Sequence, residues 1–380
     1  MNEIKPPMLK ILFVTTHSIE PYMITPDIFS KYEFHPHRYC KIVKEFANPI
    51  LAYLSLSVKE KTLLVHKFGH PMIAYPVTFN RKHFNYEISR ELHEDIIRSD
   101  VDIIHVHNYY SLTYDLIVLL NNIRKKPIVG HYHGGDLSML LYPFRILKRM
   151  TLPLADKLLV TNKFEVQRLV SVCKVPEEKI AYIHDGVDTD FFKPLNTINK
   201  EDNLILFVGN LVKEKGVDLL LLAFKKCKQK VKNLKLLIVG EGYMRDYLEK
   251  MIKTLNLTND VKLAGRLPHD ALRVIYNKAT ITVLPSKREA LPFVLLESMA
   301  CGTPVIATIN EGTMEILSHG YDGLLVKQDD VMALSEAICK LISESSVREE
   351  MGKRAREKVV RNFSIVEFAR KIKKLYESLI

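Results

Sequence analysis

Cysteine is scarce in this chain, and its spacing excludes two kinds of stabilised fold. The five cysteines, Cys40, Cys173, Cys227, Cys301 and Cys339, are odd in number, far apart and never spaced as C-x-x-C. Neither a disulfide framework nor a cysteine-based zinc site is indicated. We therefore expect a protein of a reducing compartment.

Long apolar runs are absent as well. The N-terminal apolar run, residues 8–14, is too short for the core of a signal peptide, and no stretch reaches the roughly 18 uncharged apolar residues that a membrane-spanning helix needs. We expect a cytoplasmic protein, either soluble or peripheral at the cytoplasmic face of the membrane.

The composition is otherwise that of a folded protein. Of the 380 residues, 47% are hydrophobic and 26% are charged, which excludes disordered and fibrous classes and favours two domains. The net charge of +11 is spread over both halves of the chain. It suits anionic partners such as nucleotides or an acidic membrane surface, but not a dedicated nucleic-acid binder, which usually concentrates its charge in one stripe.

Short apolar, β-rich runs alternate with segments of helical period, which is typical of βαβ units and parallel sheets. The expected strands are residues 10–16, 62–68, 102–107, 127–133, 157–161 and 180–184, followed by 204–209, 234–240, 261–265, 281–285, 304–308 and 323–326. The class is α/β with two Rossmann-like halves. A polar linker at 193–203 separates an N-terminal domain, 1–193, from a C-terminal domain, 204–362. No strand follows the last predicted helix, 363–380, so this helix must pack on elements that precede it in the chain.

Two nucleotide-binding motifs fail in this sequence. The segment VGEGYMRDYLE at 239–249 begins with G-x-G, but Arg245 stands at the third glycine position of a dinucleotide-binding motif. No P-loop string occurs. A bound cofactor is therefore not expected.

The most informative stretch is TVLPSKREALPFVLLESMACGTPVIAT, residues 282–308. A buried strand is followed by a loop carrying Glu289, and Pro292 stands where a helix can begin. Backbone N–H groups around Phe293 and Val294 are then free at a positive helix end and suit an anionic or hydroxylated ligand, so Leu291, Pro292 and Phe293 are candidate ligand-binding residues. Glu297 lies one turn inside the helix, so both carboxylates can face one pocket.

The run E-A-L-P-F-V-L-L-E, residues 289–297, resembles the E-x7-E signature of retaining glycosyltransferases with the GT-B fold, most closely glycosyltransferase family 4. The resemblance implies two Rossmann-like domains facing a cleft and metal-independent transfer of a hexosyl unit from a nucleotide-diphosphate sugar. The resemblance further implies that the donor sits mostly on the second domain, that the acceptor is a glycan or a lipid-linked sugar, and that the last helix, 363–380, crosses back to the N-terminal domain.

Phosphate-binding residues follow from the same resemblance. In FVGNLVKEKG, Lys215 occupies the position of the family's lysine, whereas Asn210 replaces an arginine that the family usually carries. An amide cannot supply the charged fork of a guanidinium, so Arg266 is a candidate to supplement Lys215.

The resemblance also assigns roles to the remaining residues. Glu297 accepts hydrogen bonds from the ribose. Glu289 orients the transferred hexose together with His133, which lies in the motif GHYHGGDL. Asp136 is a weaker candidate for positioning the acceptor. Two departures concern the acceptor side and the donor loop: residues 15–40 are glycine-free and aromatic, and Glu311 stands at a position where the family has glycine.

A predicted helix at 139–150, MLLYPFRILKRM, leaves two interpretations open. It packs on the core with a solvated basic edge of Arg145, Lys148 and Arg149, or this edge contacts an anionic membrane that holds a lipid-linked acceptor.

Other functions also stay open. Within the same fold the alternatives are a sugar-nucleotide epimerase and a glycan phosphorylase. From another class, the rival is a basic, non-catalytic protein that binds nucleic acid or membrane.

Overall fold

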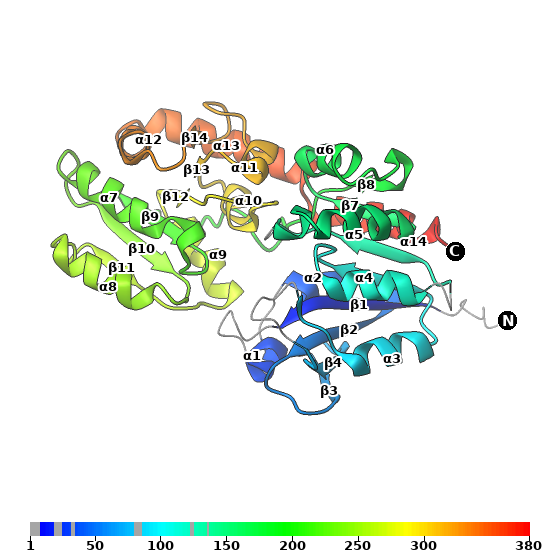
Figure 1. Ribbon diagram of the computed structural model, residues 1–380. Helices are drawn as coiled ribbons and strands as arrows, with labels where there is room; N and C mark the ends of the chain where they lie inside the picture. The colour runs from blue at the N-terminus through cyan, green and yellow to red at the C-terminus, as the bar shows by residue number, and fades with distance from the viewer. Residues whose placement is uncertain (1–7, 19–24, 32–34, 80–85, 122–124, 135–136) are drawn as a thin grey trace. The chain divides into compact units, whose positions relative to one another are not determined.

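The computed structural model describes residues 8–18, 25–31, 35–79, 86–121, 125–134 and 137–380. The chain divides into two compact units (Figure 1). The first unit comprises Met1–His184 together with Ala369–Ile380, and the second comprises Asp185–Phe368. The division thus falls before the polar segment 193–203, and the end of the last helix groups with the first unit.

The first unit is built on a largely parallel sheet. Among the described residues its strand order is β3-β4-β2-β1-β5-β6-β7-β8, and the pair β3–β4 is antiparallel. The strands are β1 (Leu9–Ser18), β2 (Ala47–Ser55), β3 (Thr62–Val65), β4 (Pro71–Pro76), β5 (Ile103–His107), β6 (Ile128–His131), β7 (Lys157–Val160) and β8 (Ile180–Tyr182). Every residue of β5 and β6 is buried, as expected for central strands of a parallel sheet covered on both faces.

Helices connect these strands. They are α1 (Pro26–Lys31), α2 (His35–Val43), α3 (Arg90–Arg98), α4 (Leu112–Leu120), α5 (Phe144–Thr151) and α6 (Lys163–Ser171), and the end of α14 (Ile365–Glu377) joins them. Side chains of Ser89, Ser111 and Asn162 accept hydrogen bonds from the first turns of α3, α4 and α6, which fixes where these helices begin.

The second unit has a fully parallel sheet in the order β11-β10-β9-β12-β13-β14. Its strands are β9 (Leu204–Val208), β10 (Lys235–Val239), β11 (Val261–Leu263), β12 (Ile281–Leu284), β13 (Val305–Thr308) and β14 (Leu324–Val326). This is the doubly wound strand order of a Rossmann fold, in which the chain changes direction between its first and fourth strands, here β9 and β12.

The helices of the second unit are α7 (Val217–Lys228), α8 (Arg245–Thr254), α9 (His269–Lys278), α10 (Phe293–Ala300), α11 (Glu311–Ile316), α12 (Val331–Ser343) and α13 (Ser345–Asn362), with a 3-10 turn, η7 (Lys213–Lys215), before α7. A single apolar core runs through this unit: α7 packs against α12, and α10 against α13.

The α/β prediction is confirmed, and each expected strand is found within a few residues of its predicted bounds. Two strands of the first unit, β2 and β4, were not predicted. The glycine-free segment 15–40 carries the helix α1 and the start of α2, so its described part is not one long loop.

Candidate functional site

The loops that follow β9 and β12 emerge at the point where the second sheet changes winding direction. These two strands are neighbours, paired in parallel from Ile281 beside Ile205. In open α/β sheets ligands bind outside the carboxyl ends of the strands at this point. The loop after β9 carries Asn210 and Lys215, and the loop after β12 carries Glu289.

Lys215 and Glu289 form an ion pair at this edge. The ammonium of Lys215 lies 2.5 Å from Oε1 of Glu289, and the two side chains are 24% and 11% exposed. Sequence reasoning assigned one residue to phosphate and the other to the sugar without expecting them to touch. Their contact shows that the two loops form one polar site.

A close backbone approach brings the two loops together. Gly216 follows Lys215 with φ +64°, and a Cβ at this residue would lie 2.4 Å from the carbonyl oxygen of Pro285. The N–H of Lys287 also donates to the carbonyl of Glu214 at 2.7 Å. Only glycine fits both the left-handed backbone and the contact, so the position of Lys215 depends on Gly216.

The N-terminus of α10 lies directly after Glu289. Pro292 is the N-cap residue and makes no side-chain capping hydrogen bond. The positive end of the dipole of α10 therefore lies beside Glu289, which suits an anionic or hydroxylated ligand. Leu291, in the same loop, is buried.

The start of α11 supports the same loop. The N–H of Gly312 donates to the carbonyl of Glu289 at 2.9 Å. A Cβ on Gly312 would lie 2.6 Å from that carbonyl oxygen. Although Glu311 departs from the family pattern, the glycine beside it thus holds the Glu289 loop.

Glu297 lies in the second turn of α10 and is only 3% exposed. The hydroxyl of Tyr276, from α9, donates to its Oε2 at 3.0 Å. Sequence reasoning did not identify Tyr276, because its distance from Glu297 along the chain gives no signal. This hydrogen bond orients the carboxylate.

The two remaining donor candidates lie at other strand ends. Asn210 is exposed directly after β9, in the loop that leads to Lys215. Arg266 is partly buried after β11, which is separated from β9 by β10 in the sheet. The structure thus places Asn210 on the loop that carries Lys215, and Arg266 at the end of a strand that is not adjacent to β9.

In the first unit, three histidines in β5 and β6 and a fourth just after β6 lie close together. His107 pairs with His131 in register, so the imidazoles at alternate positions share one face. Nε2 of His105 lies 3.1 Å from Nδ1 of His131, and Nδ1 of His107 lies 2.6 Å from Nε2 of His133. His133 is therefore oriented by His107, a contact that sequence reasoning missed although two H-x-H repeats on adjacent strands could have indicated it.

Tyrosines extend this cluster. The hydroxyl of Tyr376, in α14, lies 2.8 Å from Nδ1 of His105, and that of Tyr39, in α2, lies 3.4 Å from Nε2 of His131. Asp136, the other candidate in this region, lies outside the described residues.

The prediction for Lys148 was wrong. Its side chain is fully buried, and its ammonium is 2.8 Å from both carboxylate oxygens of Asp115. Burial lowers the pKa of Lys148, and burial likewise raises the pKa of Asp115, while their ion pair opposes both shifts. Lys148 stabilises the interior of the first unit and is not part of a basic outer edge.

The predicted helix at 139–150 is also interrupted. A 3-10 turn (Ser138–Leu140) comes first, and α5 begins only at Phe144, after a cis Tyr142–Pro143 bond. Arg145 and Arg149 are exposed on α5 together with the apolar side chains of Ile146 and Met150, and Leu141 and Tyr142 are exposed just before this helix. Among the described residues, no helix combines the length and the apolar character needed to span a membrane.

Comparisons with known proteins match both units. The family model for Glycosyltransferase Family 4 matches residues 52–191, and that for Glycosyl transferases group 1 matches residues 188–358. An uncharacterized glycosyltransferase of Methanocaldococcus jannaschii is 28% identical over 371 residues, which cover 94% of this chain and 98% of the relative.

Two solved structures share the fold over almost the whole chain. Sucrose-phosphate synthase of Thermosynechococcus elongatus superposes with a TM-score of 0.76 at 21% identity, covering 98% of this chain and 99% of that chain. Anabaena HepE, solved in complex with UDP-glucose, superposes with a TM-score of 0.76 at 17% identity, covering 97% and 100%.

Proposed function

Because this chain belongs to the GT-B glycosyltransferases of family 4, we propose that it transfers a hexosyl unit from a nucleotide-diphosphate sugar to a glycan or lipid-linked acceptor, with retention of anomeric configuration. The observation that carries the proposal is the ion pair of Lys215 and Glu289 at the change of winding, beside the N-terminus of α10.

The pair suits a diphosphate donor because it keeps the ammonium of Lys215 near the positive N-terminus of α10. Lys215 gives a charge-assisted hydrogen bond to the pyrophosphate, and the N–H groups from Phe293 onward add to the positive potential. Glu289 holds the ammonium in place until the donor arrives, and then orients the sugar. No metal ion takes part in this arrangement.

Glu297 on the second unit and His133 on the first unit have separate roles in this proposal. Oriented by Tyr276, the carboxylate of Glu297 accepts hydrogen bonds from ribose hydroxyls. His133, oriented by His107, bonds to the transferred hexose. No side chain acts as a covalent nucleophile. The bond from the anomeric carbon to the diphosphate breaks, the acceptor oxygen bonds to that carbon on the same face, and the departing phosphate takes the acceptor's proton, so the protein contributes positioning and electrostatic stabilisation.

Calorimetry with a free nucleoside diphosphate tests the phosphate site. Lys215→Ala removes one charge-assisted contact worth roughly 1.5–3 kcal/mol, so affinity should fall about ten- to a hundredfold. Lys213→Ala is the matched control, since Lys213 lies on the same turn and is exposed. Equal affinities for wild type and Lys215→Ala would show that the phosphate site has been misplaced.

We further propose that the exposed face of α5 and the turn before it meet the membrane that carries a lipid-linked acceptor. Supporting this, the face combines exposed apolar side chains, among them Ile146 and Met150, with the cations Arg145 and Arg149. Apolar groups that enter the lipid interface, next to arginines that attract anionic headgroups, are typical of peripheral membrane contact.

A further inference from the structure

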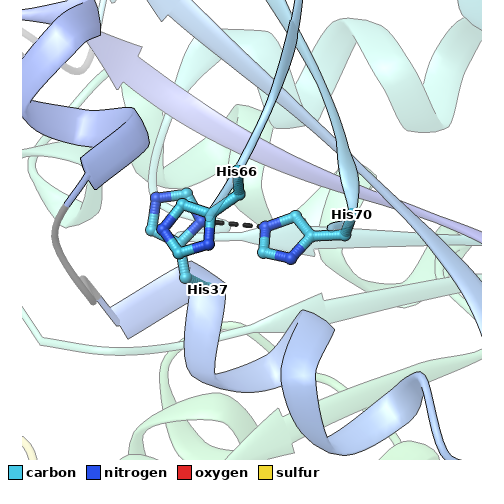
Figure 2. Close-up of side chains that lie close together, drawn as sticks. All are labelled: His37, His66 and His70. Atoms are coloured by element: carbon cyan, nitrogen blue, oxygen red, sulfur yellow. Dashed lines mark hydrogen bonds between the residues drawn. The ribbon is translucent and has the colours of Figure 1, made fainter. Parts of the chain in front are cut away.

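Three histidines of the first unit meet away from the histidine cluster of β5 and β6. His37 comes from α2, His66 follows β3, and His70 precedes β4 (Figure 2). All three are at most 1% exposed. Neither the resemblance to the family nor the proposed transfer reaction uses them.

The three rings lie close enough to share one ion. Nδ1 of His37 is 3.0 Å from Nε2 of His70, and the ring of His66 stacks on that of His37 with centroids 4.0 Å apart. One ring nitrogen from each histidine can be chosen so that all three lie within 4.8 Å of one another. Two ligands of a tetrahedral zinc ion are separated by roughly 3.3 Å, given Zn–N bonds of about 2.0–2.1 Å. Because χ2 of histidine has a broad energy minimum, rotation of the rings about it can shorten the nitrogen–nitrogen distances to those around a bound zinc ion.

Hydrogen bonds to the backbone hold α2, β3 and β4 together without an ion. The antiparallel pair β3–β4 ends with Val65 opposite Pro71, and the N–H of His66 donates to the carbonyl of His70 at 3.0 Å. Lys44, just after α2, donates from Nζ to the carbonyl of Phe68 at 3.0 Å in the turn between the two strands. The site therefore does not depend on a loop that must first become ordered.

Buried nitrogen atoms here favour a ligand. Nδ1 of His70 is buried without a hydrogen-bond partner among the described residues, which is costly for a polar atom. Burial lowers the pKa of His70 to about 4 and that of His37 to about 2, so both rings are neutral at physiological pH. A neutral imidazole is the form that binds metal ions.

We propose that His37, His66 and His70 bind Zn²⁺ or a similar late transition-metal ion and thereby tie α2 to the β3–β4 hairpin. Imidazole nitrogen suits zinc, copper and nickel, whereas magnesium and calcium prefer oxygen ligands. Three protein ligands leave a fourth position open.

The first test titrates Co²⁺ and Zn²⁺ into the full chain after chelator treatment and dialysis. His66→Gln and His70→Gln keep a neutral polar side chain but remove a ligand, and His319→Gln, at an exposed histidine of the second unit, is the control. Because His105, His107 and His131 form a second group that could hold an ion, bound equivalents are counted. We expect each ligand variant to lose one equivalent, or to bind it at least about tenfold more weakly. Unchanged binding in both variants would overturn the proposal.

A second measurement uses only the wild-type chain, so it does not depend on whether a variant folds. Crystals soaked in Zn²⁺ should show an anomalous peak between the three rings, and Zn²⁺ should raise the thermal unfolding midpoint while equal Mg²⁺ does not. Anomalous peaks only elsewhere, or equal effects of the two ions, would refute the site.

Discussion

Replacing Lys148 by methionine should strongly destabilise the first unit. Methionine has a similar length but no charge, and the ammonium it replaces donates to the carbonyls of Tyr109 and Ser111, at 2.8 and 2.9 Å, as well as to both oxygens of Asp115. The change leaves the Asp115 carboxylate buried, with the hydroxyl of Thr151 still donating a hydrogen bond to it at 2.6 Å. Breaking a buried pair from one side typically costs about 3–5 kcal/mol.

The pH dependence of this cost has a definite sign. Burial already raises the pKa of Asp115 in the wild type, and loss of Lys148 removes the interaction that opposes this shift. In the variant, folded Asp115 therefore holds a proton at pH values where the unfolded chain has released it. Stability is lost as the pH rises above the unfolded value of about 3.9, so the variant's deficit should be larger at pH 8 than at pH 5.

Urea unfolding followed by circular dichroism and tyrosine fluorescence measures the effect, since the chain has 17 tyrosines and no tryptophan. Arg145→Met, on the exposed side of the same helix, is the control and should stay within about 0.5 kcal/mol of wild type. The double variant Lys148→Met/Asp115→Leu should recover most of the loss, because an apolar pair of similar volume can replace a buried ion pair. A loss below about 1 kcal/mol for Lys148→Met at pH 8, or an equal loss for Arg145→Met, would refute this reasoning.

Three further outcomes are expected. Glu297→Gln should weaken binding of a nucleoside diphosphate in calorimetry. Glu289→Gln frees Lys215, so it should leave this affinity intact but lower turnover. Equal loss of affinity in both variants would show that the two roles are wrongly divided. Turnover should survive EDTA, because Lys215 and the N-terminus of α10 neutralise the charge of the diphosphate. Loss of a zinc ion from the first unit would lower only the unfolding midpoint. Turnover that is lost in EDTA and recovers when manganese is added would contradict metal-free transfer. Replacing Arg145 and Arg149 by Gln should weaken binding to anionic vesicles, measured by sedimentation, by about 1 kcal/mol per charge, and by less at high salt. The control Lys226→Gln/Lys262→Gln, on the second unit, should not weaken it. Wild-type protein that stays in the supernatant at low salt would exclude membrane contact.

The fold was largely predictable because buried parallel strands appear in the sequence as short apolar runs. The strands β9 to β14 follow this pattern closely. β2 was missed because Pro49 lies within it, although proline cannot donate to a sheet and argues against a central strand. β4 begins and ends with proline and was missed for the same reason.

The candidate site was predictable only where its residues are close in sequence. Glu289, Pro292 and Glu297 lie on one loop and helix, and their spacing gave the motif. The contact of Glu289 with Lys215, and of Glu297 with Tyr276, depends on how strands are ordered in the sheet, which no local pattern encodes. Lys148 was misplaced because helical spacing does not tell whether a lysine among apolar residues faces solvent or a buried carboxylate.

The histidine site shows the same limit. The spacing of His66 and His70, with three residues between them, is one that metal sites use, but the third ligand, His37, lies far away on α2. Only the packing of this helix against β2, next to β4, brings it within reach.

The central claim, transfer from a nucleotide sugar, is tested most directly by nucleotide release. Wild type, Lys215→Ala and Lys213→Ala are incubated with a panel of nucleotide-diphosphate sugars and glycan acceptors, and free nucleoside diphosphate is quantified. We predict release from at least one donor, faster with an acceptor present, and about ten- to a hundredfold slower in Lys215→Ala at donor concentrations below saturation, but not in Lys213→Ala. No release from any donor, or equal rates in wild type and Lys215→Ala, would contradict the account.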